Sequence, residues 1–374
     1  MLALLLLTTA LVVLLPMLPA WAEWRRPSDV VPLHIDSRDA LDPPFLARSF
    51  AQQLAAALAQ GQPRLGQSRL ARVPSRGNWL VSQAERRAGA SRQVWHTAGD
   101  VRLPPDADLL GEVAAGGDLH AAAGRIYRGL LAGQHLHIGP QATVLRWAHG
   151  LDVAVGDGCQ LAGRTTAERS LTVGRGVAFT LLHAPAVRFG PAEPLAVPAP
   201  DAAKAMDPER LRLGLPEVRW DNVAGRGVTT EALRTGPGRA WRGDLVCQAD
   251  LTLGRQCRVR GSIKARGDLQ AEVGCRVVGN LVAVGRIVLG ADCVVLGAVV
   301  SETAVLLGPG CVVGAPDAPA TVTAPRIVVS PGVVVHGTLW AGERGTTPAA
   351  AQVAPAPAVE EDDTGGDQPQ RVWA

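Results

Sequence analysis

The sequence predicts an all-β fold, a parallel β-helix built as a triangular solenoid in which coils of about 17–18 residues stack on one another. The first observation behind this prediction is a ladder of cysteines at a constant step of 18 residues, formed by Cys257, Cys275, Cys293 and Cys311. The second is the alternation of apolar residues with polar or small ones between these cysteines. The third is a high glycine content, 42 of 374 residues, against a usual share of about 7%.

A coil of this length holds three short strands joined by tight turns, so equivalent positions form columns along the stack. We expect the inward columns to hold small or aliphatic side chains, because a triangular cross-section leaves no room for bulky rings. Aromatic residues indeed make up only 4% of the chain. The cysteines are therefore interpreted as small apolar side chains stacked inside. This structural core ladder consists of Cys159, Cys257, Cys275, Cys293 and Cys311.

Two chemical roles for the cysteines are alternatives to this structural role. Zinc binding needs closely spaced ligands such as C-x₂-C, which the sequence lacks. Disulfides between neighbouring coils are the second alternative, but stacked parallel strands rarely match disulfide geometry. The phrase that precedes the cysteines is also regular, as in Leu289-Gly-Ala-Asp-Cys293, although its glycine is shifted in Ala271-Glu-Val-Gly-Cys275.

The N-terminal segment Leu2–Ala22 contains no charged residue and is long enough to cross the hydrocarbon core of a bilayer as a helix. The first basic residues, Arg25 and Arg26, follow it directly, so the positive-inside rule places the rest of the chain in the cytoplasm. We expect residues 1–22 to be a single inner-membrane anchor. The alternative is a cleaved signal sequence, because Ala20-Trp-Ala22 resembles a signal-peptidase site, and it would make the protein periplasmic.

Residues 23–98 are expected to be helical or irregular and to contain one short amphipathic helix. That helix follows Pro44 and ends before Gly61. We expect it to cap an open end of the solenoid or to bind a partner. Its apolar face is formed by residues at helical spacing: Phe45, Leu46, Phe50, Leu54 and Leu58.

Two related β-helical blocks are predicted, residues 99–190 and 243–341. The pattern that begins at Asp100, with Gly-Asp-Leu at 117–119, returns 150 residues later at Asp250, with Gly-Asp-Leu at 267–269. Residues 191–242 break the period and are predicted to be a Pro-rich insertion with a short helix starting at Asp207. One interrupted solenoid is favoured over two adjacent ones, because separate blocks would each end in unpaired strands. Residues 342–374 are expected to form a disordered acidic tail.

Basic residues concentrate on the early coils of the second block. Anionic lipid or nucleic acid could bind such a surface. Because no aromatic residues interleave with these charges for base stacking, we interpret the surface as a solvated outer face and expect no nucleic-acid partner. The residues concerned are Arg255, Arg258, Arg260, Lys264 and Arg266.

The coils also divide into hexads, so the enzyme-class alternative is a hexapeptide-repeat acyltransferase. Such an enzyme needs a general base, usually histidine, in a cleft between subunits, and the candidates are His183 and His336. His135 and His137 flank Leu136 and share one face of a strand, which is a weak metal signal. No P-loop, Rossmann glycine motif or nucleophile elbow is present. We therefore expect no catalytic residues, no cofactor and no metal.

The stretches Gly261-Ser-Ile-Lys-Ala-Arg-Gly-Asp-Leu-Gln-Ala271 and Gly279-Asn-Leu-Val-Ala-Val-Gly-Arg-Ile-Val-Leu-Gly290 resemble the bactofilins, the polymer-forming cytoskeletal proteins of bacteria. The resemblance covers residues 243–314 well and 99–190 loosely. It implies a right-handed triangular β-helix that polymerises end to end without nucleotide, often at the membrane, as a scaffold for envelope or cell-shape machinery. This chain differs in its long N-terminal segment, its insertion and its second block.

From these observations we expect a non-enzymatic, membrane-anchored scaffold that self-associates through its coil ends. Its expected partners are further copies of itself, the membrane through Leu2–Ala22, and envelope-synthesis proteins. A periplasmic, envelope-binding β-solenoid is the remaining alternative and depends on cleavage of the N-terminal segment.

Overall fold

The computed structural model describes residues 42–73, 90–190, 218–221 and 225–349, together with residues 1, 3–4, 8–9, 11, 14–18, 21 and 25. Two compact units are formed, Met1–Asp42 and Pro43–Ala374. In the first unit the described residues include a short 3-10 helix, η1 (Leu15–Met17). Much of the predicted anchor lies outside the described residues. Among those that are described, none belongs to a helix with the length and apolar character needed to span a bilayer.

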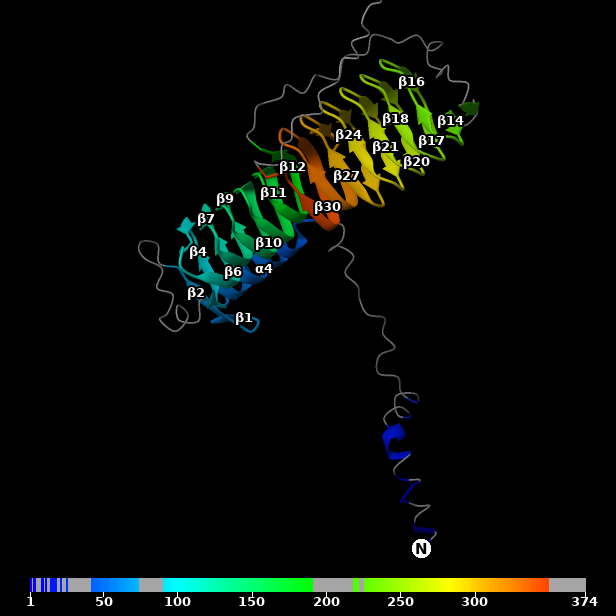
Figure 1. Cartoon of the computed structure of the whole chain (residues 1–374). Helices are drawn as coiled ribbons and strands as arrows, with labels where there is room; N and C mark the ends of the chain where they lie inside the picture. Colours follow the sequence, from blue (N-terminus) through cyan, green and yellow to red (C-terminus); the bar gives the residue numbers. More distant parts are fainter. Residues whose placement is uncertain are drawn as a thin grey trace, which may run out of the picture. The chain divides into compact units, whose positions relative to one another are not determined.

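The second unit is a β-solenoid of about 13 turns, which confirms the mostly β, solenoid part of the predicted fold (Figure 1). One α-helix, α4 (Phe45–Ala59), precedes the strands. The first block comprises β1 (Arg64–Leu65), β2 (Ser68–Arg72), β3 (Ala90–Ser91), β4 (Val94–Thr97), β5 (Val101–Arg102), β6 (Asp108–Ala115), β7 (Leu119–Ala121), β8 (Ile126–Ala132), β9 (His135–Ile138), β10 (Thr143–Val155), β11 (Gln160–Val173) and β12 (Ala178–Phe189).

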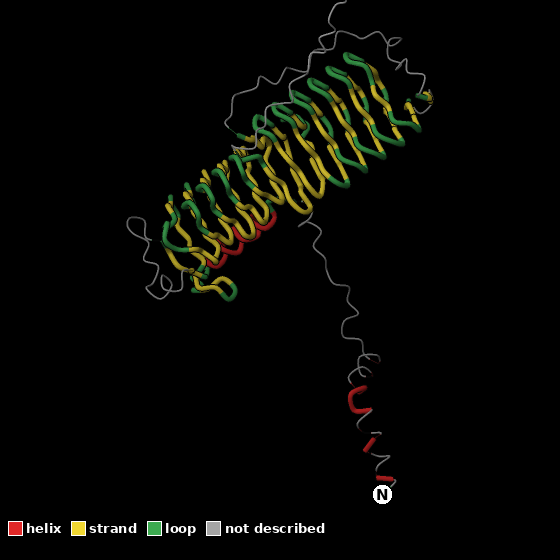
Figure 2. Tube along the Cα trace, in the orientation of Figure 1, coloured by secondary structure: helices red, strands yellow, loops and turns green. Residues whose placement is uncertain are grey.

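The second block follows the undescribed residues 191–217, and strands and turns recur in its successive coils (Figure 2). It comprises β13 (Arg219–Asp221), β14 (Arg226–Thr229), β15 (Leu233–Arg234), β16 (Ala240–Arg242), β17 (Asp244–Cys247), β18 (Leu251–Leu253), β19 (Arg258–Arg260), β20 (Ile263–Ala265), β21 (Leu269–Ala271), β22 (Arg276–Val278), β23 (Leu281–Ala283), β24 (Ile287–Leu289), β25 (Val294–Val295), β26 (Val299–Ser301), β27 (Ala304–Leu307), β28 (Val312–Val313), β29 (Ala320–Val329) and β30 (Val334–Thr346).

Successive coils of the second block pair in parallel at the predicted period. Ile263 of β20 lies opposite Leu281 of β23, and Leu281 lies opposite Val299 of β26, so one inward column runs through three coils. All three side chains are fully buried. The strands therefore alternate between a buried apolar face and an outward face, which is the pattern the sequence indicated.

The five-residue sequence that ends at each ladder cysteine, called the corner phrase below, carries its glycine at different positions. The backbone conformation explains this difference. The residue directly before each cysteine of the ladder adopts a left-handed conformation, with φ of 73° at Gly274 and 56° at Asp292. Glycine adopts this conformation without steric cost, and Asn or Asp tolerate it better than most other residues. The glycine of Ala271-Glu-Val-Gly-Cys275 is therefore placed at the strained position, whereas other coils carry glycine two residues earlier.

The pattern at Asp100 that returns 150 residues later at Asp250 corresponds to the same turn in both blocks. Asp100 Oδ1 accepts a 2.8 Å hydrogen bond from the backbone N–H of Asp118, one coil later, and Asp250 Oδ1 accepts the same bond from Asp268. The glycine before each donor leaves room for the carboxylate, because a Cβ on Gly117 would lie 2.0 Å from Asp100 Oδ1. The motif thus joins adjacent coils at a corner where regular strand pairing stops.

The expectation that bulky rings are excluded from the interior is wrong at a few positions. The largest fully buried side chains are aromatic: Trp241, Tyr127, Phe179 and Phe189. Trp241 lies in the first coil of the second block, and the two phenylalanines lie in the last coil of the first block. Such terminal coils have a coil of the same block on only one side, so ring packing is less constrained there. Tyr127 lies in the inner strand β8, between β6 and β10, and its hydroxyl accepts a 2.8 Å hydrogen bond from the Ala122 N–H.

The described coils extend beyond the boundaries expected from the period. In the first block β2 already pairs in parallel with β4, so the stack includes residues before position 99. In the second block β14 pairs with β17, although it lies within the predicted insertion. In the second block the corner phrase does recur before β16, as Thr235-Gly-Pro-Gly-Arg239, but it ends in arginine and not in cysteine, so the cysteine ladder did not mark this coil. The short helix predicted at Asp207, residues 23–41 and residues 350–374 fall outside the described residues.

The helix α4 lies along the side of the first block and does not cover a coil end (Figure 2). The Phe50 ring lies 5.2 Å from the Trp147 ring of β10 between centroids. Its buried residues are Ala47, Leu54 and Ala57, whereas Leu58, expected on the apolar face, is exposed. The helix therefore does not cap an open end of the solenoid, as was expected, but packs against the side of the first block. Its small alanines allow close approach to the flank of the solenoid.

Candidate functional site at the block junction and the coil ends

The two blocks meet through their last coils. Strand β12 of the first block pairs antiparallel with β30 of the second, whereas successive coils within a block pair in parallel, as β6 does with β8 and β20 with β23. The antiparallel register arises because both blocks advance toward the junction from opposite ends, so their final strands run in opposite directions (Figure 1). The coil edges that separate blocks would leave unpaired are thereby satisfied within one chain.

Backbone and side-chain hydrogen bonds hold the junction together. Phe189 donates its backbone N–H to Val333 O at 3.0 Å, and Gly332 donates to Phe189 O at 2.7 Å. At the other edge the Thr347 hydroxyl accepts a 2.8 Å bond from the Val177 N–H and donates to Gly174 O at 3.0 Å. Thr347 is buried, so these bonds form away from water, where leaving them unmade is costly.

Both histidines named as candidate bases lie at this junction. His183 Nδ1 is 2.8 Å from the Thr338 hydroxyl across the β12–β30 pair. His336 Nδ1 lies 2.8 Å from the carbonyl oxygen of Pro185, so this nitrogen is the donor. Each histidine therefore links the first block to the second. Sequence reasoning treated them as isolated, because the 151 to 155 residues between the partners hide the contact.

An ion-pair cluster beside the junction was missed by the sequence analysis. Arg48 of α4 contacts Glu168 of β11 at 2.8 Å, and His149 Nε2 of β10 lies 3.4 Å from the same carboxylate. The Arg48 hydrogen bond, with smaller contributions from His149 and His183, lowers the pKa of Glu168 below its ordinary value. His149 Nδ1 in turn lies 2.7 Å from the Thr166 hydroxyl. This cluster ties α4 to the last coils of the first block.

The opposite ends of the solenoid have edges that pair on one side only, within the described residues. At the start of the second block, β15 pairs with β18 and β16 pairs with β19, and neither has a partner on its other edge. The neighbouring β14 is covered by β13, which pairs with it antiparallel. At the start of the first block, β5 likewise pairs with one strand. These edges carry free backbone donors and acceptors.

The structural ladder lies inside the solenoid. Its five cysteines are at most 1% exposed, and all six cysteines of the chain are free thiols. Each ladder thiol donates to a backbone carbonyl of the preceding coil, for example Cys275 to Gly254 at 3.1 Å and Cys311 to Gly290 at 3.0 Å. Cys247 belongs to a different column, opposite Ala265. The ladder thus satisfies corner carbonyls as well as filling space.

The pKa is raised at four of the five ladder thiols, whereas the contact with Cys293 lowers the pKa of Cys311. Burial raises the pKa of the Cys159 thiol. At Cys275 the contact with Cys257 favours the thiolate, but the Cys293 thiol and burial outweigh it and raise the pKa to about 11. Because the thiolate is the nucleophile, the thiols with a raised pKa are poor reactants near neutral pH.

Three further histidines, His120, His135 and His137, are exposed on the outer face of the first block. His135 Nδ1 is 2.8 Å from Asp118 and its Nε2 is 3.6 Å from Asp152. The rings of His120 and His137 lie 5.8 Å apart on adjacent strands, so His137 contacts His120 and not His135. Across the described ranges no group of three or more His, Cys, Asp or Glu is arranged to hold a metal ion.

The basic residues predicted on the early coils of the second block are all exposed, as a solvated outer face requires. They lie on or beside β18, β19 and β20: Arg255, Arg258, Arg260, Lys264 and Arg266.

Comparisons with known proteins identify no relative of this chain. No family model, no curated protein and no solved structure matches the chain. What can be concluded at this point is the fold, a β-solenoid protein whose two blocks are joined through their last coils.

Proposed function

We propose that the protein is a non-enzymatic, bactofilin-like scaffold that self-associates through the free ends of its solenoid at the bacterial inner membrane. Such a scaffold would support the organisation of the cell envelope or of cell shape. One observation carries the proposal: the first coil of the second block leaves one edge of β15 and of β16 without a partner among the described strands. Edges of this kind pair with other strands unless they are covered.

The block junction supports the proposal because it is an end-to-end contact of the proposed kind, made within one chain. There, one terminal coil accepts another through strand pairing and side-chain hydrogen bonds. Since both last coils are used in the junction, assembly between molecules has to use the first coils. The repeating unit would therefore be a whole two-block rod joined through β15 and β16 at one end and β5 at the other.

The charge of the free ends predicts how assembly depends on salt. Arg64, Arg69 and Arg72 are exposed at the start of the first block, and Arg239 and Arg242 are exposed at the start of the second. Like charges brought together repel, and ions screen this repulsion over about 8 Å at 0.15 M ionic strength. We therefore expect assembly of the rods to increase as salt rises from low ionic strength.

A single proline tests the edge directly. Leu233 and Thr235 donate their backbone N–H groups to the carbonyl oxygens of Asp250 and Thr252 in the next coil, so the N–H of Arg234 points to the free edge. Arg234→Pro removes this outward donor and leaves the β15–β18 bonds in place. Arg234→Ala is the matched control, because it loses the same ion pair to Glu272 but keeps the N–H.

The measurement is electron microscopy and light scattering of the detergent-solubilised full chain. We expect filaments or elongated oligomers for the unmodified chain and for Arg234→Ala, and shorter species for Arg234→Pro. Unmodified protein that stays monomeric at all salt and protein concentrations tested would contradict the proposal.

Membrane attachment through Leu2–Ala22 is part of the proposal and has its own test. N-terminal sequencing of the protein in the membrane fraction should find an intact start. A mature start at Glu23 would instead favour the periplasmic, envelope-binding alternative.

The positions of the candidate histidines support a structural role over an acyltransferase. His183 and His336 each use Nδ1 for a contact across the junction. A hexapeptide-repeat acyltransferase would place its base in a cleft between subunits and bind acyl-CoA. Calorimetry with acetyl-CoA is therefore expected to give no binding heat, and saturable binding would favour the enzyme.

A further inference from the structure

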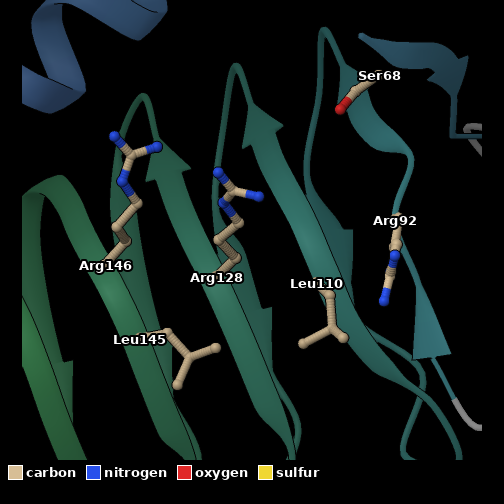
Figure 3. Close-up of a pocket in the computed structure, with 6 residues that line it drawn as sticks. All are labelled: Ser68, Arg92, Leu110, Arg128, Leu145 and Arg146. Carbon is tan, nitrogen blue, oxygen red and sulfur yellow. The ribbon is translucent and has the colours of Figure 1, made fainter. Parts of the chain in front are cut away.

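A pocket of about 460 Å³ lies on the flank of the first block (Figure 3). It spans the outer faces of β6, β8 and β10 and reaches β2. Figure 3 shows the Arg128 and Arg146 guanidinium groups side by side on neighbouring strands, with Leu110 and Leu145 beneath them and Ser68 and Arg92 opposite. The lining therefore combines three cationic side chains with two apolar ones.

The pocket arises from a mismatch in coil length. Strand β6 places Leu110 and Gly111 opposite the single residue Arg128 of β8, and β10 places Leu145 and Arg146 opposite the same residue. The coil that contains β8 is thus one residue shorter here than both of its neighbours. A two-against-one pairing is a β-bulge, which bends the strand and redirects side chains. The missing residue leaves the hollow over Arg128.

A second short strand in the same block shows how such a mismatch can be filled. Thr180 of β12 lies opposite Ala162 and Gly163 of β11. Its hydroxyl lies 3.1 Å from the Ala162 carbonyl oxygen and 2.7 Å from that of Gly163, so the side chain turns back onto the bulge. Arg128, in the corresponding position, instead forms an ion pair with Glu112. The hollow beside β8 is consequently left open.

The pocket carries uncompensated positive charge. Glu112 Oε1 lies 3.1 Å from Arg128 Nε and 3.8 Å from Arg146 Nη1, so one carboxylate serves two guanidinium groups. Arg92 has no ion-pair partner among the described residues. Like charges on neighbouring strands destabilise a sheet. Three cations and one anion leave a net charge of about +2 for a bound anion to neutralise.

We propose that this pocket binds a phosphate-bearing ligand. The planar guanidinium fork matches the oxygen geometry of phosphate, and charged hydrogen bonds of this type are about twice as strong as neutral ones. The Ser68 hydroxyl supplies a further donor at the rim. Leu110 and Leu145 offer apolar surface to the carbon atoms attached to the phosphate. Ser68 and Arg92 belong to the first coils of the first block, but phosphate binding does not require self-association, so binding and assembly are tested by separate measurements.

The test measures binding to the full-length protein in neutral detergent at low ionic strength, by calorimetry with inorganic phosphate. Arg128→Gln and Arg146→Gln are each expected to weaken binding by about tenfold, the loss that corresponds to one charged hydrogen bond. Glu112→Gln removes the competing carboxylate and is expected to tighten binding. Arg258→Gln, an exposed arginine of the second block, is the matched control and should bind as the unmodified chain does.

The opposite signs expected for Glu112→Gln and Arg128→Gln keep the test decisive even if one variant is less stable. Equal weakening in Arg258→Gln, or no binding by the unmodified chain, would overturn the proposal. A second titrant separates the sources of the phosphate. Stronger Arg128-dependent binding of glycerophosphoglycerol, a soluble phosphodiester, points to a lipid headgroup, whereas stronger binding of inorganic phosphate points to a free phosphate monoester.

Discussion

His183 and Thr338 share a hydrogen bond of 2.8 Å although 155 residues separate them in the chain. The bond crosses the only described place in the solenoid where coils from the two blocks pair, with β12 antiparallel to β30. The stack of about 13 turns thus contains one internal reversal of chain direction. This reversal gives the rod two ends that both consist of first coils.

The close packing of Gly345 at the junction predicts that adding one methyl group there lowers the stability of the protein. A Cβ on Gly345 would lie 2.2 Å from a ring carbon of Phe179, which is buried and packed near Phe189. Gly345→Ala is therefore expected to lower the free energy of unfolding by about 1–3 kcal/mol, the usual cost of overpacking. Chemical denaturation followed by circular dichroism measures this change.

Gly342→Ala is the control for the junction, because its Cβ would meet only ordinary contact at 3.7 Å from Pro325. Equal stability of the Gly345 and Gly342 variants would show that the junction does not hold the two blocks as described.

The repeated aspartate corner predicts equal losses at two sites 150 residues apart. Asp100→Ala and Asp250→Ala each remove the acceptor of a 2.8 Å bond from the next coil. We expect each variant to lose about 1–3 kcal/mol in free energy of unfolding, the range for a hydrogen bond to a charged group. Asp317→Ala, in an exposed turn, is the comparison and should unfold as the unmodified chain does. A clear loss at only one of the two sites would break the equivalence of the blocks.

The contact between α4 and Glu168 predicts a dependence on acid. Arg48 lowers the pKa of Glu168 from 4.5, so its contribution to stability is complete above that value and is lost as pH falls through the lowered pKa. The difference in thermal midpoint between the unmodified chain and Arg48→Gln should therefore shrink between pH 5 and pH 3.

Glu168→Gln gives the matched comparison, since it removes the titrating group while keeping its shape. Both groups are about half exposed, so a small difference is expected. A gap between the unmodified chain and Arg48→Gln that stays constant down to pH 3 would mean that Glu168 is not the group responsible.

The buried ladder predicts that the thiols resist modification. All six cysteines are free and buried, and burial disfavours the reactive thiolate. Treatment of the native protein with N-ethylmaleimide near neutral pH should leave the ladder unlabelled by mass spectrometry. Unfolding in guanidinium should expose all six to rapid labelling. Fast labelling of Cys275 or Cys293 in the native protein would contradict the packing described.

The sequence by itself determined the coil. The 18-residue step, the inward columns and the corner at Asp250 could be predicted because each strand residue pairs with its equivalent one period away. A parallel stack repeats its contacts at a constant sequence separation, so a periodic pattern contains the fold. The cysteine ladder marked that period, although it did not show that each thiol also donates to a corner carbonyl.

Only the tertiary structure decided how the blocks meet, where α4 lies and where the surface is hollow. At the junction the partners run antiparallel, so their sequence separation changes from pair to pair, as for His183 with Thr338 and Arg188 with Val334. No fixed period can encode such a contact. The same holds for Arg48 with Glu168 and for the pocket over Arg128, which depends on a one-residue difference between neighbouring coils.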